Sequence, residues 1–125
     1  MVIGADQLVE IDRRILTKPQ NRTAAREQIQ LLSGRTHEII TGIFLISPAG
    51  HRSAVDVSRV SFFDLTSQEV EAYLDSNEWE GCAGGYRVEG RGQWLIKNIE
   101  GDRSNIQGLP MLQLVRLLRE LNDSI

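Results

Sequence analysis

Two long apolar segments joined by a short turn constrain the fold of this chain more than any other feature. Residues 36–47, which include the run HEIITGIFLIS, are rich in β-branched and apolar side chains, the types that favour strands. Pro48-Ala49-Gly50 then supplies a turn, and a second extended run follows up to Phe62. The pattern predicts an antiparallel hairpin, and therefore a sheet that the rest of the chain must cover.

The second segment of this hairpin carries a change of phase. Its apolar positions fall at Val55 and Val57 and then at Val60 and Phe62, so the alternation shifts by one residue. Because side chains of a strand alternate between its two faces, the shift predicts a β-bulge near residues 58–59.

Helix signals occur at three places. Asn21 is a candidate N-cap and Gly34 a candidate C-terminal stop for one amphipathic helix. Thr66 and Glu69 have the spacing of a capping box, and Pro110 suits the first turn of the last helix. In that last helix we expect the following side chains to point inward: Leu112, Val115, Leu118 and Leu121.

Further strands are predicted on both sides of the hairpin, at residues 2–10, 14–16 and 94–99. Strands and helices alternate, without an internal repeat or a linker. The expected architecture is an α/β fold in which helices flank a mixed β-sheet. At 125 residues the chain has the length of one ordinary domain, so we predict a single domain over residues 1–125.

Composition narrows the classes of partner. The formal net charge is -3 with acids and bases interspersed, which does not favour nucleic acid or a membrane surface as a partner. No apolar run approaches the length of a membrane span, and the amino terminus lacks the pattern of a signal peptide. Cys82 is the single cysteine, which is typical of a reducing compartment. These features predict a soluble, cytoplasmic protein.

Asp6 is the first candidate for chemistry. It follows the short apolar run Val2-Ile3 at the start of the predicted strand and two small residues, Gly4 and Ala5, which allow a ligand to approach the backbone closely. A carboxylate in that place can hold a metal ion or accept a proton. An ordinary aspartate at a turn or sheet edge is the alternative.

Lys18 and Glu89 are the next candidates. Lys18 precedes a proline and is suited to meet a phosphate, whereas Glu89 lies in the glycine-rich segment YRVEGRG, where a loop could present it to a ligand. A solvated lysine and a surface glutamate are the alternatives. His37 and His51 lack the spacing of a zinc site, and a lone cysteine such as Cys82 is more often a small buried thiol.

The polar segment at residues 101–105, just before the last helix, leaves two interpretations open. The amino end of a helix can bind an anion, or it can be capped by its own side chains.

Five stretches in order resemble the Maf family of nucleoside triphosphate pyrophosphatases, which are related in fold to the inosine triphosphatases. They span nearly all of the chain: IGADQLV, TKPQNRTAAREQIQLLSGRTHEIITG, VSFFDLTSQEVEAYL, CAGGYRVEG and IEGDRSNIQGLPMLQL. The resemblance implies hydrolysis of a nucleoside triphosphate to the monophosphate and pyrophosphate, with a divalent cation, Mg or Mn, as cofactor.

The same resemblance implies roles for four residues. Asp6 is similar to the family's general base and would also hold the metal, and Lys18 would contact phosphates, although Thr17 stands where the family usually has glycine. Gln7 and Glu89 occupy the two positions through which members recognise the base. Thymidine- and uridine-directed members typically carry threonine and glutamine there. The pair found here resembles the branch that acts on 7-methyl-GTP and on pyrimidine triphosphates.

Members of the family also begin with a strand and a Ser-x-x-Arg-Arg loop, and this chain begins at the strand that leads to Asp6. The resemblance therefore implies a chain without the family's N-terminal segment, either as a fragment or shortened product of a longer protein or as a reduced homologue. This leaves two hypotheses, a nucleotide pyrophosphatase and a non-catalytic nucleotide-binding or dimerisation module. The second follows because loss of that segment would expose apolar sheet surface and favour a homodimer.

Overall fold

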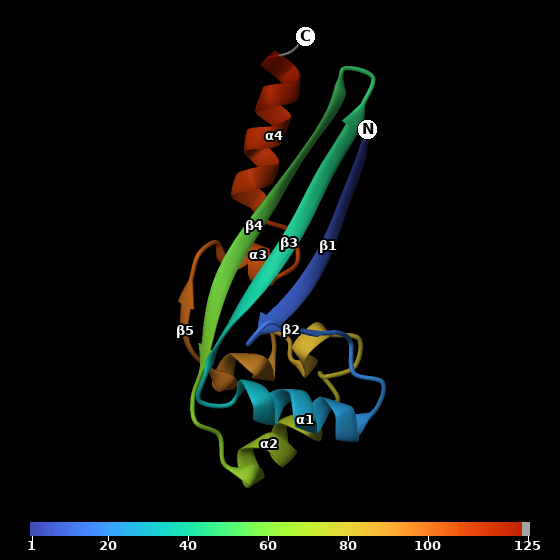
Figure 1. Ribbon diagram of the computed structural model, residues 1–125. Helices are drawn as coiled ribbons and strands as arrows, with labels where there is room; N and C mark the ends of the chain where they lie inside the picture. The colour runs from blue at the N-terminus through green and yellow to red at the C-terminus, as the bar shows by residue number, and fades with distance from the viewer. Residues whose placement is uncertain (124–125) are drawn as a thin grey trace.

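A five-stranded sheet forms the centre of the protein (Figure 1). The computed structural model describes residues 1–123, so the last two residues of the predicted domain lie outside the described residues. The strands follow the order β2-β1-β3-β4-β5 across the sheet. Their bounds are β1 (Val2–Ile11), β2 (Arg14–Leu16), β3 (Thr36–Ser47), β4 (Gly50–Phe62) and β5 (Ile96–Glu100).

The sheet confirms the predicted α/β class with flanking helices, but not the expected mixture of strand directions. Each pair of neighbouring strands in residues 1–123 runs antiparallel. The turns that join β1 to β2 and β3 to β4 are too short for any other pairing. The longer connections begin and end at the same end of the sheet, so β3 and β5 each run opposite to the strand beside them.

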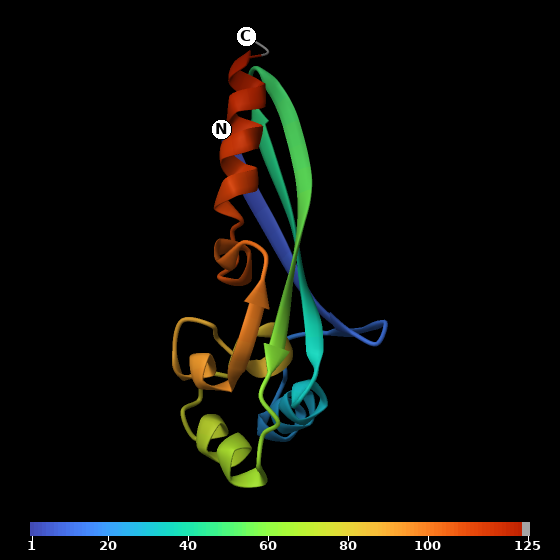
Figure 2. The same ribbon diagram turned by 90° about the vertical axis from the view of Figure 1, so that its left-hand side faces the viewer.

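The helices lie at both ends of this sheet (Figure 2). Helices α1 (Arg22–Leu32) and α2 (Ser67–Leu74) pack on each other at one end, and α4 (Met111–Asp123) covers β3 and β4 at the other. The short α3 (Arg103–Ile106) lies between these two groups. Two 3-10 helices, η1 (Ala83–Gly85) and η2 (Arg91–Leu95), belong to the connection between α2 and β5. Within residues 1–123, no helix is both long enough and apolar enough to cross a membrane.

The predicted helix ends are confirmed. The Asn21 side chain accepts a hydrogen bond from the Ala24 N–H at 2.8 Å, and both hydrogen bonds of the capping box between Thr66 and Glu69 are present. Gly34, just beyond α1, has a φ of +67°, a conformation that glycine adopts without strain. Local chemistry therefore determines where α1 and α2 begin and where the chain leaves α1.

The predicted bulge near residues 58–59 is wrong. The register between β3 and β4 is uninterrupted from the turn to the pairing of Thr36 with Ser61. Val55 and Val57 instead lie on the outer face of the sheet, 64% and 45% exposed. The apolar residues of β4 therefore switch from the outer to the inner face of the sheet along the strand, and β4 contains no extra residue relative to β3.

The inner face of the sheet holds two apolar clusters. The larger cluster packs α1 and α2 against the end of the sheet where Val9, Ile39 and Val60 lie. The smaller cluster joins Ile43 and Leu45 of β3 to α4. Between the two clusters the inward positions of the strands are polar, and Asn105 of α3 lies against them. We call these five residues the polar belt: Gln7, Thr41, Asp56, Ser58 and Asn105.

Helix α4 is rotated relative to the expectation. Leu121 is buried and Leu118 partly buried, as predicted, but Leu112 is 74% and Val115 46% exposed. Leu114 and Leu117 take the inward positions together with Leu121. Residues three and four apart form one narrow stripe of a helix, and only that width contacts β3 and β4.

The opposite face of the sheet carries exposed apolar side chains. Phe44 lies over Gly4, where an added Cβ would come within 2.0 Å of the ring, so a side chain at residue 4 would displace Phe44. Within the described chain, no helix packs against this side. We call the following set the outer apolar face: Val2, Phe44, Ile46, Val55 and Val57.

The rotation of α4 gives a direct test of which leucines form the smaller cluster. Leu117→Ala should lower the free energy of unfolding by roughly 2–5 kcal/mol, because Leu117 is 1% exposed and a cavity would remain. Leu112→Ala, the matched control, should change it by less than about 0.5 kcal/mol. Urea denaturation measures both values. Equal losses for the two variants would contradict the observed rotation.

Candidate nucleotide-binding pocket

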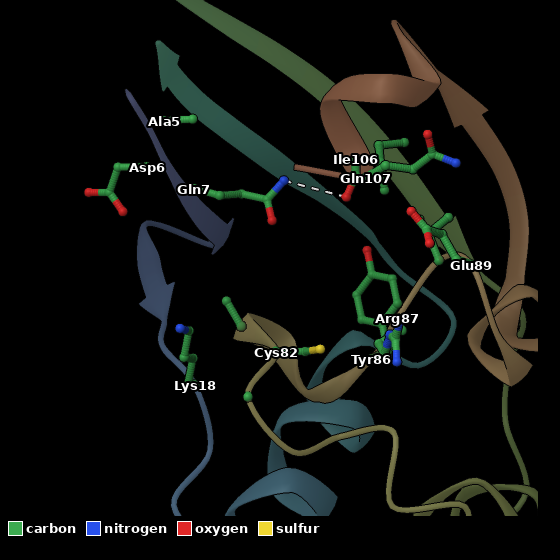
Figure 3. Close-up of a pocket in the computed structure, with 13 residues that line it drawn as sticks. Ala5, Asp6, Gln7, Lys18, Cys82, Tyr86, Arg87, Glu89, Ile106 and Gln107 are labelled. Carbon is green, nitrogen blue, oxygen red and sulfur yellow. Dashed lines mark hydrogen bonds between the residues drawn. The ribbon is translucent and has the colours of Figure 1, made fainter. Parts of the chain in front are cut away.

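A pocket of about 380 Å³ opens beside the edge of β1 (Figure 3). β2 pairs with β1 only from Val9 onward, so the earlier part of β1 has an open side. The structure brings all four residues singled out from the sequence to this pocket: Asp6, Gln7, Lys18 and Glu89. Their roles stay predictions, but their assembly from three separate segments is a structural fact.

Asp6 and Gln7 point in opposite directions from β1. Consecutive side chains of a strand project from opposite faces, and Figure 3 shows the Asp6 carboxylate directed away from the Gln7 amide. The Asp6 side chain is exposed and makes no hydrogen bond or ion pair within residues 1–123, although the backbone of Asp6 pairs with Gly42 of β3. Lys18 is drawn at the same end of the pocket as Asp6, and Glu89 lies at the other end. The pocket therefore has an end with Asp6 and Lys18 and an end with Gln7 and Glu89.

The loop that carries Glu89 is held by tight backbone contacts. The Glu78 carboxylate accepts hydrogen bonds from the N–H groups of Arg91, at 3.0 Å, and Gly92, at 3.3 Å. A Cβ added to Gly92 would lie 1.9 Å from the carbonyl oxygen of Arg87. This part of the glycine-rich segment is therefore a close-packed turn that fixes the position of Glu89, and not a loose phosphate-binding loop.

Tyr86 forms part of the pocket wall and is supported from behind by His37. The Nε2 atom of His37 and the hydroxyl oxygen of Tyr86 are 2.6 Å apart, and both residues are buried. Both rings contact Phe62 edge-on. Burial lowers the pKa of His37 to about 4, so the imidazole is neutral at pH 7. His37 is thus a buried structural histidine, whereas His51 is exposed.

Cys82 also lines the pocket, but its chemistry is not that of a nucleophile. Burial raises the pKa of the Cys82 thiol, and the positive charges of Arg87 and Lys18 oppose that shift only in part. The thiol stays protonated at neutral pH, so the reactive thiolate is scarce.

Three further polar side chains line the pocket and were not predicted from the sequence: Tyr86, Arg87 and Gln107. Arg87 brings a second cation to the pocket, in addition to Lys18. The sequence feature that could have identified Arg87 is its position in the stretch CAGGYRVEG, two residues before Glu89.

A divalent cation fits this pocket only as part of a larger complex. Within residues 1–123, no three His, Cys, Asp or Glu side chains are placed together to hold a metal ion. Asp6 is a single exposed carboxylate. Mg²⁺ in nucleotide sites is commonly bound by one or two carboxylates together with phosphate oxygens. The donor set therefore suits an ion that is held jointly by Asp6 and a phosphate group.

The amino end of α4 is capped by the protein itself. Ser104 Oγ accepts from the Met111 N–H at 2.8 Å, and Asp102 accepts from the N–H groups of Ser104 and Leu112. These bonds lower the pKa of Asp102, with the Ser104 hydroxyl as the main cause. Of the two interpretations of this segment, the contacts support the capped helix.

Comparison with known proteins gives one consistent result. The family model described as "Maf-like protein" matches residues 1–121. The chain is 40% identical over all 125 residues to proteins named dTTP/UTP pyrophosphatase from Bacillus anthracis and Bacillus cereus (strain AH187), and it spans 65% of their length. The protein of the same name from Bacillus cereus (strain ATCC 10987 / NRS 248) is also 40% identical, and the chain spans 62% of it.

Because His37 is buried, we expect the free energy of unfolding to decrease at acidic pH. Between pH 6.5 and 4 the His37 imidazole binds a proton in the unfolded chain but not in the folded protein. The free energy of unfolding therefore falls as pH falls, by about 3 kcal/mol at most. His37→Gln keeps a hydrogen-bonding side chain but cannot titrate, and should flatten this slope in urea denaturation series. His51→Gln is the exposed control and should leave the slope unchanged. Identical slopes in all three proteins would refute the assignment to His37.

Proposed function

This chain belongs to the Maf family, and on that premise we propose that its pocket hydrolyses a nucleoside triphosphate to the monophosphate and pyrophosphate. The observation that carries the proposal is the pocket itself. An acid and a cation, Asp6 and Lys18, line one end, and two hydrogen-bonding side chains, Gln7 and Glu89, line the other. A nucleotide has the same division, with charged phosphates at one end and a polar base at the other.

At the phosphate end, Asp6 would orient a water molecule and accept its proton. The water oxygen would form a bond to the α-phosphorus while the bond from that phosphorus to the bridging oxygen breaks, which releases pyrophosphate. Lys18 would offset the negative charge that grows on the departing pyrophosphate. The exposed Asp6 carboxylate has no partner within residues 1–123 and is free for this task.

We propose Mg or Mn as the cofactor. Asp6 would be the protein ligand and the triphosphate would supply the other oxygens, in keeping with the donor set described above. Such an ion neutralises phosphate charge when it is bound.

At the base end, two observations support two substrate classes. The relatives named dTTP/UTP pyrophosphatase support a pyrimidine triphosphate. The Glu89 carboxylate accepts hydrogen bonds from ring N–H and amino groups and repels a carbonyl edge, which supports 7-methyl-GTP. We propose that the substrate belongs to one of these two classes.

A second candidate function is a non-catalytic nucleotide-binding or dimerisation module. The outer apolar face supports it, because exposed apolar patches mark association surfaces and its occupant would be a second copy of the chain. The cytoplasmic location expected from composition stays a prediction.

Catalysis is tested by incubating the purified chain with Mg or Mn and separate triphosphates: 7-methyl-GTP, GTP, dTTP, UTP and CTP. Asp6→Asn should reduce pyrophosphate release by roughly 10²–10⁴-fold, because the acceptor for the water proton is removed. Asp64→Asn, an exposed acid outside the pocket, should keep the original rate. Absence of release from every substrate, or equal release from Asp6→Asn, would exclude hydrolysis by this chain.

Association is tested by light scattering over a range of protein concentrations. If the outer apolar face joins two copies, Val55→Lys should raise the dimer dissociation constant by about tenfold or more, because two like charges would enter the interface. Val115→Lys, which adds a charge on the exposed side of α4, is the matched control. A monomer at every concentration would eliminate the dimerisation module.

A further inference from the structure

The polar belt contains a fully buried amide whose contacts lead to the pocket. Asn105 of α3 is 0% exposed. Its Nδ2 atom donates to Ser58 Oγ at 3.0 Å and to the carbonyl oxygen of Ile39 at 3.2 Å. One side chain therefore ties α3 to β4 and β3 at the same time.

The start of α3 is held by the same serine. Ser58 Oγ donates to the carbonyl oxygen of Asp102 at 3.2 Å, and a Cβ added to the neighbouring Gly101 would lie 2.8 Å from Ser58 Oγ. α3 is thus fixed against the sheet at both of its ends, with little room to shift.

The carboxyl end of α3 presents two backbone carbonyls to Gln7. Gln7 Nε2 donates to the carbonyl oxygen of Asn105 at 2.7 Å and contacts that of Ile106 at 3.4 Å and Thr41 Oγ1 at 3.5 Å. The reversed amide would place Gln7 Oε1 against two carbonyl oxygens, which repel it. The Gln7 oxygen is therefore left to face the other way, as Figure 3 shows.

We propose that Asn105 is a positioning residue: by fixing α3 it locks the Gln7 amide, so that the pocket presents a hydrogen-bond acceptor, and not a donor, at this position. Gln7 Oε1 and the Glu89 carboxylate then make two acceptors at one end of the pocket. The matching ligand edge carries two N–H donors, as the N1–H and 2-amino groups of guanine do. Uracil has one ring N–H between two carbonyls. This step rests on the proposed function, because it takes the ligand to be a nucleotide.

The side chain of Asn105 is unfavourable for packing alone. Its Oδ1 atom is buried and has no hydrogen-bond partner within the described chain, which destabilises the folded state. An apolar side chain would avoid that cost but would leave α3, and with it the carbonyls that hold Gln7, without their tie to the sheet.

The lock is tested first without any ligand. In the ¹⁵N-labelled protein, the side-chain NH₂ group of Gln7, assigned through Gln7→Leu, should exchange with solvent about tenfold or more slowly than that of the exposed Gln107. Asn105→Ala should abolish this protection, and Asn98→Ala, an exposed asparagine on β5, should preserve it. Equal exchange of Gln7 and Gln107 in the unmodified chain overturns the proposal.

The consequence for recognition is tested by binding of 7-methyl-GTP, UTP and inorganic tripolyphosphate, which has no base. Asn105→Ala should raise the dissociation constant of 7-methyl-GTP by about tenfold and change that of tripolyphosphate by less than about twofold. In a protein that already carries Gln7→Ala, Asn105→Ala should not weaken 7-methyl-GTP binding further. Two outcomes would show that Asn105 is merely structural and would overturn the proposal. In the first, Asn105→Ala weakens 7-methyl-GTP binding by the same factor whether or not Gln7→Ala is present. In the second, Asn105→Ala also weakens binding of tripolyphosphate.

Two further outcomes keep the test decisive. If Asn105→Ala does not fold, Ser58→Ala removes one partner of the same amide and should reproduce the loss of Gln7 protection in weaker form. Unchanged protection in that variant counts against the proposal. If the unmodified chain binds no nucleotide but protects the Gln7 amide in an Asn105-dependent way, the proposed function fails while the lock stands.

Discussion

The uninterrupted pairing of β3 with β4 determines where every other element can lie. Twelve paired positions in one register give each residue of the hairpin a fixed face. The inward positions at one end require α1 and α2, those at the other end require α4, and the polar positions in the middle require α3. A slip by one residue would turn Asp56 and Ser58 to the outer face and bring Val55 and Val57 inward. The Asn105 amide would then lose the Ser58 hydroxyl as a hydrogen-bond partner.

The same alternation shapes the pocket. Neighbouring residues of β1 face opposite sides of the sheet, so Asp6 and Gln7 can serve one ligand only where the strand is an edge. β2 leaves that edge open because it pairs with only three residues of β1. A nucleotide that uses both residues has to cross the edge, with its phosphates on one face and its base on the other.

Much of the architecture was predictable from local chemistry, and the misses have physical causes. Caps at Asn21 and Thr66 and the turn after β3 were found because few neighbouring residues decide them. The faces of Val55 and Leu112 were missed, since an apolar side chain does not reveal whether anything covers it. Strand direction was missed because it depends on where long connections end. The assembly of the pocket followed from resemblance, and the part played by Asn105 depends on contacts between segments distant in sequence.

The polar belt also separates the two apolar clusters. Cooperative unfolding depends on side chains that couple one part of a core to the next, and here that coupling passes through hydrogen bonds of Asn105 and Ser58. The end that contains α4 buries few large side chains of its own. We therefore expect the molecule to behave as two folding units, in which α4 opens locally while the part that holds α1 and α2 remains intact.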